Sequence, residues 1–142
     1  MQKILLPFDG SESAKRAVQY VIDFAKAYPA MHVHVLNVQR EPNLYGNYMS
    51  ASMLDNLRAS AMSEAQRITA EAARMLEAAS VSHETHEAVG EVVGQIGAAV
   101  KEHNCTVVVM GTRGMGTLGN LVMGSVATRV VHDVPVPVLL VK

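Results

Sequence analysis

Short apolar runs alternate with longer segments of helical periodicity along this chain, and that alternation limits the folds it can adopt. Strands that alternate with helices predict an α/β protein, with a parallel sheet between helices on both faces and right-handed crossovers. The expected strands are residues 3–8, 31–38, 80–89, 106–110 and 137–141. The expected helices lie between residues 11 and 29, 53 and 79, 92 and 103, and 125 and 133.

The five expected strands differ in polarity, and the differences predict their places in the sheet. The first and fourth are the most apolar, so we expect them in the middle. The third, SVSHETHEAV, is polar and suits an edge. The last, from Pro137 to Val141, is apolar on both faces. If it lies at an edge of the sheet, a bare apolar edge invites pairing with another chain, and we predict a homodimer through this strand.

Length and charge place the chain in a broad class. Its 142 residues match a single domain, residues 1–142, and about half of them are apolar. A net charge of −1 without a basic run gives no reason to expect nucleic acid or an anionic membrane surface. The apolar stretches are too short to span a bilayer, and the first residues lack the pattern of a signal peptide. The single cysteine, Cys105, fits a reducing compartment and a structural role, so we expect a cytoplasmic protein.

Residues 106–126 carry the strongest functional signal, with the sequence TVVVMGTRGMGTLGNLVMGSV. A β-branched strand stops at Gly111, a glycine-rich loop follows, and a helix begins after Gly124. A strand, a glycine loop and a helix N-terminus in this order bind phosphate through backbone N–H groups and the helix dipole. Glycines can also serve only as turn residues. However, this loop exceeds the usual two to six residues, and Gly124 and Ser125 stand where an anion site needs them.

Asp9 follows the first strand, and Gly111 ends the fourth. In open parallel sheets, ligands bind beyond the carboxyl ends of the strands where the strand order reverses. If the two strands are neighbours, Asp9 lies across a crevice from the glycine loop, where its carboxylate suits a ribose hydroxyl. Asp9 also suits a turn or a helix cap, and the two roles are compatible.

The chain resembles the universal stress protein family over essentially its full length. The motif Gly-x2-Gly-x9-Gly-Ser/Thr is met by Gly111, Gly114, Gly124 and Ser125, and the two ends, ILLPFDGS and PVPVLLVK, also match. The resemblance implies a single-domain, three-layer α/β/α fold of the adenine nucleotide alpha hydrolase-like type. Its parallel sheet would have five strands in the order 3-2-1-4-5, which puts a crevice between strands one and four.

The resemblance also implies a site for ATP, with Mg²⁺ or Mn²⁺ on the phosphates. Its residues would be Asp9 at the ribose, Pro7 along the pocket, the backbone of Val38 at adenine, Met110 and Gly111 under the nucleoside, and Gly114, Gly124, Ser125 and Val126 around the phosphates. Arg113 suits a phosphate or an exposed surface equally well.

The expected function is an ATP-binding stress or signalling switch that acts as a homodimer. A slow ATPase is an alternative, but the Walker motif GxxxxGK[ST] is absent. The first loop, DGSESA, also lacks the paired glycines of ATP-pyrophosphatases, so activity should be weak at most. A nucleotide-independent dimeric interaction protein is a third possibility, and the intact glycine motif argues against it.

Other candidate features carry weaker signals. His32 and His34 share a strand face and could chelate a metal, as could His83 and His86. Neither pair has a cysteine or carboxylate partner at a defined spacing, so we interpret both as packing or surface residues. Residues 39–52 form a loop whose tyrosines could cover a ligand or pack on the neighbouring helix, and we favour packing.

Overall fold

In this computed structural model, which describes residues 2–41, 50–113 and 123–142, five parallel strands form one sheet of order β3-β2-β1-β4-β5. The order confirms the expected topology, with the apolar strands β1 and β4 inside and β3 and β5 at the edges. The strands are β1 (Lys3–Pro7), β2 (His32–Gln39), β3 (His83–Val89), β4 (Val107–Gly111) and β5 (Val138–Val141).

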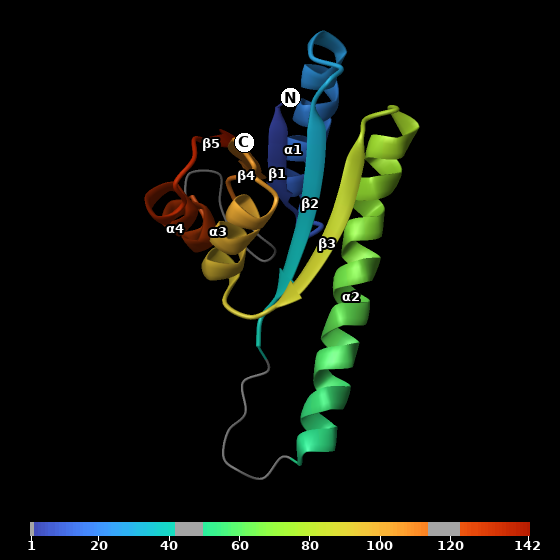
Figure 1. Cartoon of the computed structure of the whole chain (residues 1–142), viewed down its shortest axis with the longest axis vertical. Coiled ribbons are helices and arrows are strands. Elements are labelled where there is room, and N and C mark those ends of the chain that lie inside the picture. The colour runs from blue at the N-terminus through green and yellow to red at the C-terminus, as the bar shows by residue number, and fades with distance from the viewer. Residues whose placement is uncertain (1, 42–49, 114–122) are drawn as a thin grey trace.

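Helices cover both faces of the sheet, which gives the expected three layers (Figure 1). Helices α1 and α2 pack on one face, and α3 and α4 pack on the other. The helices are α1 (Glu12–Ala27), α2 (Ala51–Ala78), α3 (Val92–Glu102) and α4 (Ser125–Asp133). Within the described ranges, each helix is too short or too polar to cross a membrane.

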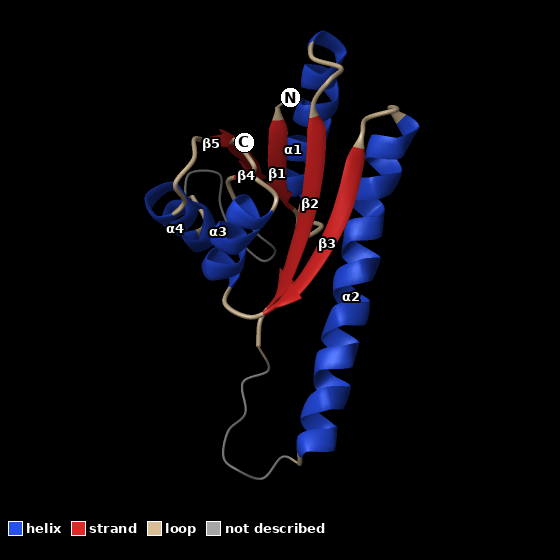
Figure 2. Ribbon diagram, viewed as in Figure 1, coloured by secondary structure: helices blue, strands red, loops and turns tan. Residues whose placement is uncertain are grey.

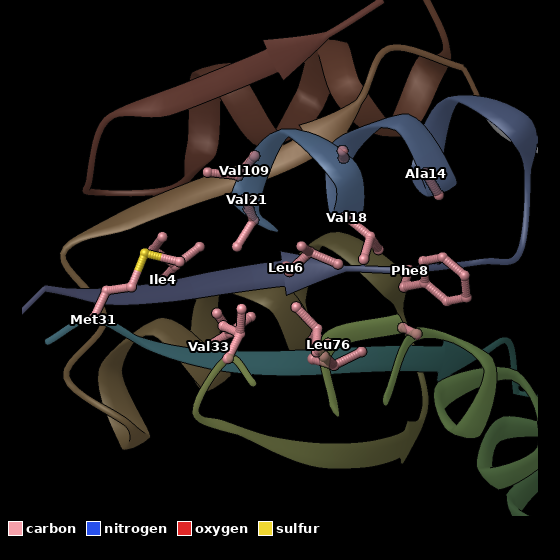
Figure 3. Close-up of a cluster of buried hydrophobic side chains, with 14 residues drawn as sticks. Ile4, Leu6, Phe8, Ala14, Val18, Val21, Met31, Val33, Leu76 and Val109 are labelled. Atoms are coloured by element: carbon pink, nitrogen blue, oxygen red, sulfur yellow. The ribbon is translucent and has the colours of Figure 1, made fainter. Parts of the chain in front are cut away.

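Strand β1 is buried on both sides, which explains its unbroken apolar sequence. Leu6 belongs to the core under α1 and α2, whereas Leu5 belongs to the core under α3 and α4. Figure 3 shows the first of these cores, where Leu6 lies among Val18, Val33 and Leu76. Full burial of such a side chain contributes roughly 1.5–3 kcal/mol. Both layers are therefore anchored on the strand that carries Asp9 at its end.

Local capping sets the element boundaries, some of which differ from the expected ones. Ser11, rather than Ser13, caps α1, because its Oγ accepts a hydrogen bond from the Ala14 N–H at 3.2 Å. Helix α2 starts two residues earlier than expected, because the Ser50 side chain caps it. Strand β3 starts later, since Ser80 has φ +57° and the Val81 N–H bonds back to the Leu76 carbonyl at 2.9 Å.

Candidate functional site

A cavity of about 690 Å³ opens at the carboxyl ends of β1, β2 and β4. Its walls include the turn after β1, the end of β2, the end of β4 and the first turn of α4. Figure 2 shows that β2 and β3 end at the same edge of the sheet. From β1, the chain goes on to β2 on one side, whereas β4 pairs on the other side, so the cavity lies where the strand order reverses.

The structure brings the predicted site residues together around this cavity. The lining includes Pro7, Asp9, Val38, Met110, Gly111, Gly124, Ser125 and Val126. Gly114 lies outside the described residues, as do Tyr45 and Tyr48 of the loop between β2 and α2.

The turn after β1 places Asp9 at the wall of the cavity. Asp9 Oδ1 accepts a hydrogen bond from the Ser11 N–H at 2.9 Å, and Gly10 between them has φ +81°. The turn role considered for Asp9 is therefore confirmed. Because the side chain still lines the cavity, it is also available to a bound ligand.

Gly111 lies where the end of β4 meets the first turn of α1. A Cβ atom there would clash with Ser13 Oγ and come within 2.6 Å of the Ser13 carbonyl carbon and 2.8 Å of the Ala14 nitrogen. Just beyond it, the Arg113 carbonyl oxygen accepts hydrogen bonds from the hydroxyl groups of Ser13 and, at 3.3 Å, Ser11. Glycine is therefore required by close packing of backbone on backbone.

The ends of the glycine-rich segment are held together by one backbone hydrogen bond. The Gly124 N–H donates to the Thr112 carbonyl oxygen at 2.6 Å, and the Thr112 N–H donates to the Val141 carbonyl oxygen at 3.1 Å. The start of α4 is thus fixed next to the end of β4, and both line the same cavity.

Helix α4 begins at the cavity with an N-cap residue, Gly124, that has no side chain. Gly124 is the N-cap residue, and no side chain in the described part of the chain hydrogen-bonds to the first turn as a cap. In contrast, Ser11, Ser50 and Glu91 cap α1, α2 and α3. Uncapped N–H groups at the positive end of a helix dipole form a site for an anion.

The long helix α2 contributes charged residues that the sequence interpretation did not assign to the site. Glu64, Arg67 and Glu71 line the cavity. Arg67 Nη2 lies 2.6 Å from Glu64 Oε1 on the same helix, whereas Glu71 Oε1 lies 3.1 Å from Lys15 Nζ of α1. Spacing along α2 gave no signal for the pair of Glu71 with Lys15, because that contact depends on how α2 packs beside α1.

Asn37 is a further residue at the site that the sequence interpretation missed. Its side chain is buried, donates from Nδ2 to the Phe8 carbonyl oxygen at 2.8 Å, and accepts from Gln39 Nε2 at 2.8 Å. It therefore joins the ends of β1 and β2 beneath the cavity. The available signal was a single amide in the otherwise apolar or histidine-bearing run MHVHVLNV.

Two other candidate features lie away from this cavity. Cys105 is buried before β4, and burial raises the pKa of its thiol to about 11, as expected for a structural cysteine. The idea that His83 and His86 chelate together is wrong. In the register with β2, His83 pairs with Val33 and His86 with Leu36, so the two histidines point to opposite faces of the sheet.

Fold and site together define an α/β protein with a crevice at the switch point of a parallel sheet. The model of the universal stress protein family matches residues 1–142. A universal stress protein of Thermus aquaticus is 31% identical, over 98% of this chain and 97% of its own length. YxiE of Bacillus subtilis is 30% identical, over 99% and 98%. The chain belongs to the universal stress protein family.

Solved structures share the fold. The structure of the protein MJ0577 matches with a TM-score of 0.83 at 27% identity, over 99% of this chain and 95% of that one. At3g01520 of Arabidopsis thaliana, a universal stress protein family member solved with AMP bound, matches with a TM-score of 0.73 at 19% identity, over 100% and 92%.

Proposed function

We propose that this protein binds ATP in the crevice between β1 and β4 and acts as a nucleotide-dependent switch in stress signalling. The observation that carries the proposal is the convergence of three elements on one cavity: the uncapped N-terminus of α4, the glycine at the end of β4, and Asp9 after β1. The cavity volume lies in the range of about 300–1,000 Å³ that small-molecule sites occupy.

In this proposal, different residues of the cavity bind the phosphates, the ribose and the adenine of ATP. The α4 N-terminus offers Gly124, Ser125 and Val126 to the phosphates. Asp9 accepts hydrogen bonds from ribose hydroxyls. The backbone of Val38 faces adenine, beside the apolar surfaces of Pro7 and Met110.

Similar proteins support an adenine nucleotide as the ligand. Besides the AMP complex, universal stress protein structures of this fold include complexes with dAMP, at 20% identity, and with cAMP, at 21% identity. The glycine motif formed by Gly111, Gly114, Gly124 and Ser125 supports a ligand that carries phosphate groups rather than adenosine alone. Among the described residues, no cluster of three or more potential metal ligands lies at the cavity. A Mg²⁺ or Mn²⁺ ion would therefore be held mainly by the nucleotide phosphates.

The first experiment tests nucleotide binding. Ligand released from the purified protein is identified by mass spectrometry, and ATP·Mg is titrated into nucleotide-free protein in a calorimeter. We expect ATP binding, while phosphate release in a separate assay stays slow because a Walker lysine is absent. If no nucleotide were released and ATP·Mg gave no heat, the proposal would be wrong. Rapid steady-state phosphate release would favour the enzyme instead of the switch.

The second experiment tests the ribose assignment through Asp9→Asn. The asparagine can keep the hydrogen bond from the Ser11 N–H, but it loses the charge that strengthens bonds from the ribose. We expect about tenfold weaker ATP binding and a smaller preference for ATP over 2′- or 3′-deoxy-ATP. Glu12→Gln is the matched control, since it removes a nearby charge that is mostly exposed and does not line the cavity. Equal losses in both variants would contradict a ribose contact.

The proposed switch acts as a homodimer through β5. This strand lies at the sheet edge, and its residues are half-buried in the single chain. The Pro137 and Val141 carbonyl groups bond to β4, so alternation directs the backbone polar groups of Val138 and Leu140 away from β4. A second copy of β5 would satisfy these groups.

A further inference from the structure

Four histidines and a glutamate gather on the α3 side of the sheet. We call His32, His34, Glu84, His86 and His103 the histidine cluster. Two residues come from β2, two from β3, and His103 follows the end of α3. None of the five lines the nucleotide cavity. The cluster is therefore a separate feature that nucleotide binding does not explain.

The strand register brings these side chains together. His34 pairs with Glu84 and Leu36 pairs with His86, so the two histidines and the glutamate project from the same face of the sheet. Helix α3 packs on that face, and the His103 ring ends up with its centroid 4.7 Å from that of His34 and 4.0 Å from that of His86. Residues distant in sequence thus bring three imidazole rings into contact.

The distances are close to those of a metal site. One nitrogen from each of His34, His86 and His103 lies within 4.8 Å of the other two. His34 Nδ1 and His86 Nε2 are 2.9 Å apart and share a hydrogen bond. Ligands about 2.0–2.1 Å from a tetrahedral Zn²⁺ stand roughly 3.3 Å from one another. The three rings are stacked at interplanar angles of 16°, 23° and 24°, so they would have to rotate about their side-chain bonds to aim three nitrogens at one ion.

A carboxylate next to the imidazoles also favours a bound cation. Glu84 adds a carboxylate, with its oxygens 3.3 Å from His32 Nε2 and 3.9 Å from His86 Nε2.

His32 supplies a second, independent observation. Its Nδ1 is 2.7 Å from Ser82 Oγ, but its Nε2 is buried and makes no hydrogen bond within the described parts of the chain, although Glu84 Oε1 is close by. Leaving a buried polar atom unsatisfied costs about 1–3 kcal/mol. If Glu84 turned toward a cation between His34 and His86, its second oxygen could accept from His32, as carboxylates beside metal sites commonly do.

We propose that His34, His86 and His103 bind a divalent transition-metal ion of the Zn²⁺ type, with Glu84 as the acidic partner. Imidazole ligands favour Zn²⁺, Co²⁺, Ni²⁺ or Cu²⁺ over Mg²⁺ and Ca²⁺. The ion would tie the end of α3 to strand β2 and the edge strand β3. Bound only by the folded state, it would stabilise the protein in proportion to its concentration.

The test uses the full-length, tag-free and nucleotide-free protein after treatment with a chelator. Zn²⁺ is titrated by calorimetry, and Co²⁺ serves as a spectroscopic probe, because tetrahedral Co²⁺ absorbs strongly in the visible range. We expect one ion per chain with micromolar affinity and an increase in Tm with Zn²⁺ but not with Mg²⁺. The absence of Zn²⁺ binding in the micromolar range would overturn the proposal and leave the cluster as a packing feature.

Variants then locate the ion. His86→Gln and His103→Gln should each weaken Zn²⁺ binding at least about tenfold and remove the Co²⁺ spectrum. His132→Gln, in the exposed last turn of α4, and His83→Gln, on the opposite face of the sheet, are the matched controls and should bind like the wild type. Circular dichroism of the metal-free variants checks folding. Unchanged binding in folded His86→Gln and His103→Gln proteins would show that the ion sits elsewhere and contradict the proposal.

Discussion

Gly111 shows how strictly a single position can be constrained in this protein. The absence of a side chain lets the end of β4 touch the first turn of α1, where backbone atoms of Ser13 and Ala14 leave no room for a Cβ. The same contact positions the Arg113 carbonyl oxygen for the hydroxyl groups of Ser11 and Ser13. Gly111 therefore holds one wall of the cavity against another.

Replacing Gly111 by alanine should lower the free energy of unfolding by about 1–3 kcal/mol, because backbone rather than a flexible side chain must move. The measurement is urea denaturation followed by circular dichroism. Gly97→Ala is the control: it lies in α3 with nothing within 4 Å of the added Cβ, so helix propensity should raise stability by up to about 1 kcal/mol. Equal stability of the Gly111→Ala and wild-type proteins would show that the contact relaxes freely.

His34 makes the stability of the metal-free protein depend on pH. Its pKa is lowered from 6.5 to about 4 in the folded state, so between these values the unfolded chain binds a proton that the folded chain does not. The free energy of unfolding should therefore fall as the pH drops below 6.5, by up to about 1.4 kcal/mol per pH unit for this proton. Above pH 6.5 the contribution should be constant.

Urea denaturation in the presence of a chelator, at several pH values from neutral down to about pH 5, measures this effect. His34→Gln should show a shallower fall than the wild type, because one perturbed group is gone. His132→Gln should follow the wild-type curve, since that histidine is exposed on α4. Parallel curves for His34→Gln and the wild type would mean that other groups carry the acid sensitivity.

At the scale of elements, α4 differs from the other helices in how it begins. Its N-cap residue Gly124 has an extended backbone, with φ −62° and ψ 152°, that most residues can adopt. Glycine is thus not needed there for backbone conformation. A residue without a side chain instead leaves the N–H groups of the first turn open to the cavity.

Gly124→Asp should therefore separate stability from binding. The carboxylate can cap α4 and favour its dipole, which should leave stability unchanged or raise it by a few tenths to about 1 kcal/mol. The same carboxylate would occupy the proposed phosphate position, so ATP affinity should fall at least about tenfold. Thermal melting and calorimetry measure the two effects, and Gly124→Ser provides a neutral cap. Undiminished ATP binding by a folded Gly124→Asp protein would place the phosphates elsewhere.

At the scale of the whole molecule, the two edges of the sheet have different chemistry. Strand β3 is polar and carries exposed Glu84, whereas β5 has the apolar sequence VLLV. The C-terminus is fixed beside α1, where Arg16 Nε donates to the Lys142 carbonyl oxygen at 2.7 Å. This contact holds β5 in place as a continuous edge to which a second chain could add.

Val138→Pro should shift the proposed dimer toward monomer. Proline removes an N–H that points away from β4, so pairing with a second chain is lost while the β4–β5 hydrogen bonds stay. Light scattering at micromolar concentration gives the mass, and Val138→Thr, which keeps both the N–H and the shape, is the control. A wild-type monomer under these conditions, or a Val138→Pro dimer, would contradict an interface through β5.

Much of the fold follows from local patterns. Strands β1 and β4 lie inside the sheet because their sequences are apolar on both faces, and β3 lies at an edge because it is polar. The prediction that Asp9, Gly111 and Gly124 lie around one crevice was correct, because parallel strands bring their carboxyl ends to one edge of the sheet. Boundaries were less predictable, since Ser11 and Ser50 fix the helix starts through particular hydrogen bonds.

By itself, then, the sequence determined the order of the elements, the inner strands and the edge at which the crevice forms, because periodicity and polarity act within each segment. Only the tertiary structure decided which distant side chains meet. His34, His86 and His103 come together through the register of β2 with β3 and the place where α3 ends. Glu71 pairs with Lys15 because of how α2 packs beside α1. Such contacts depend on relative positions of elements, which no local pattern encodes.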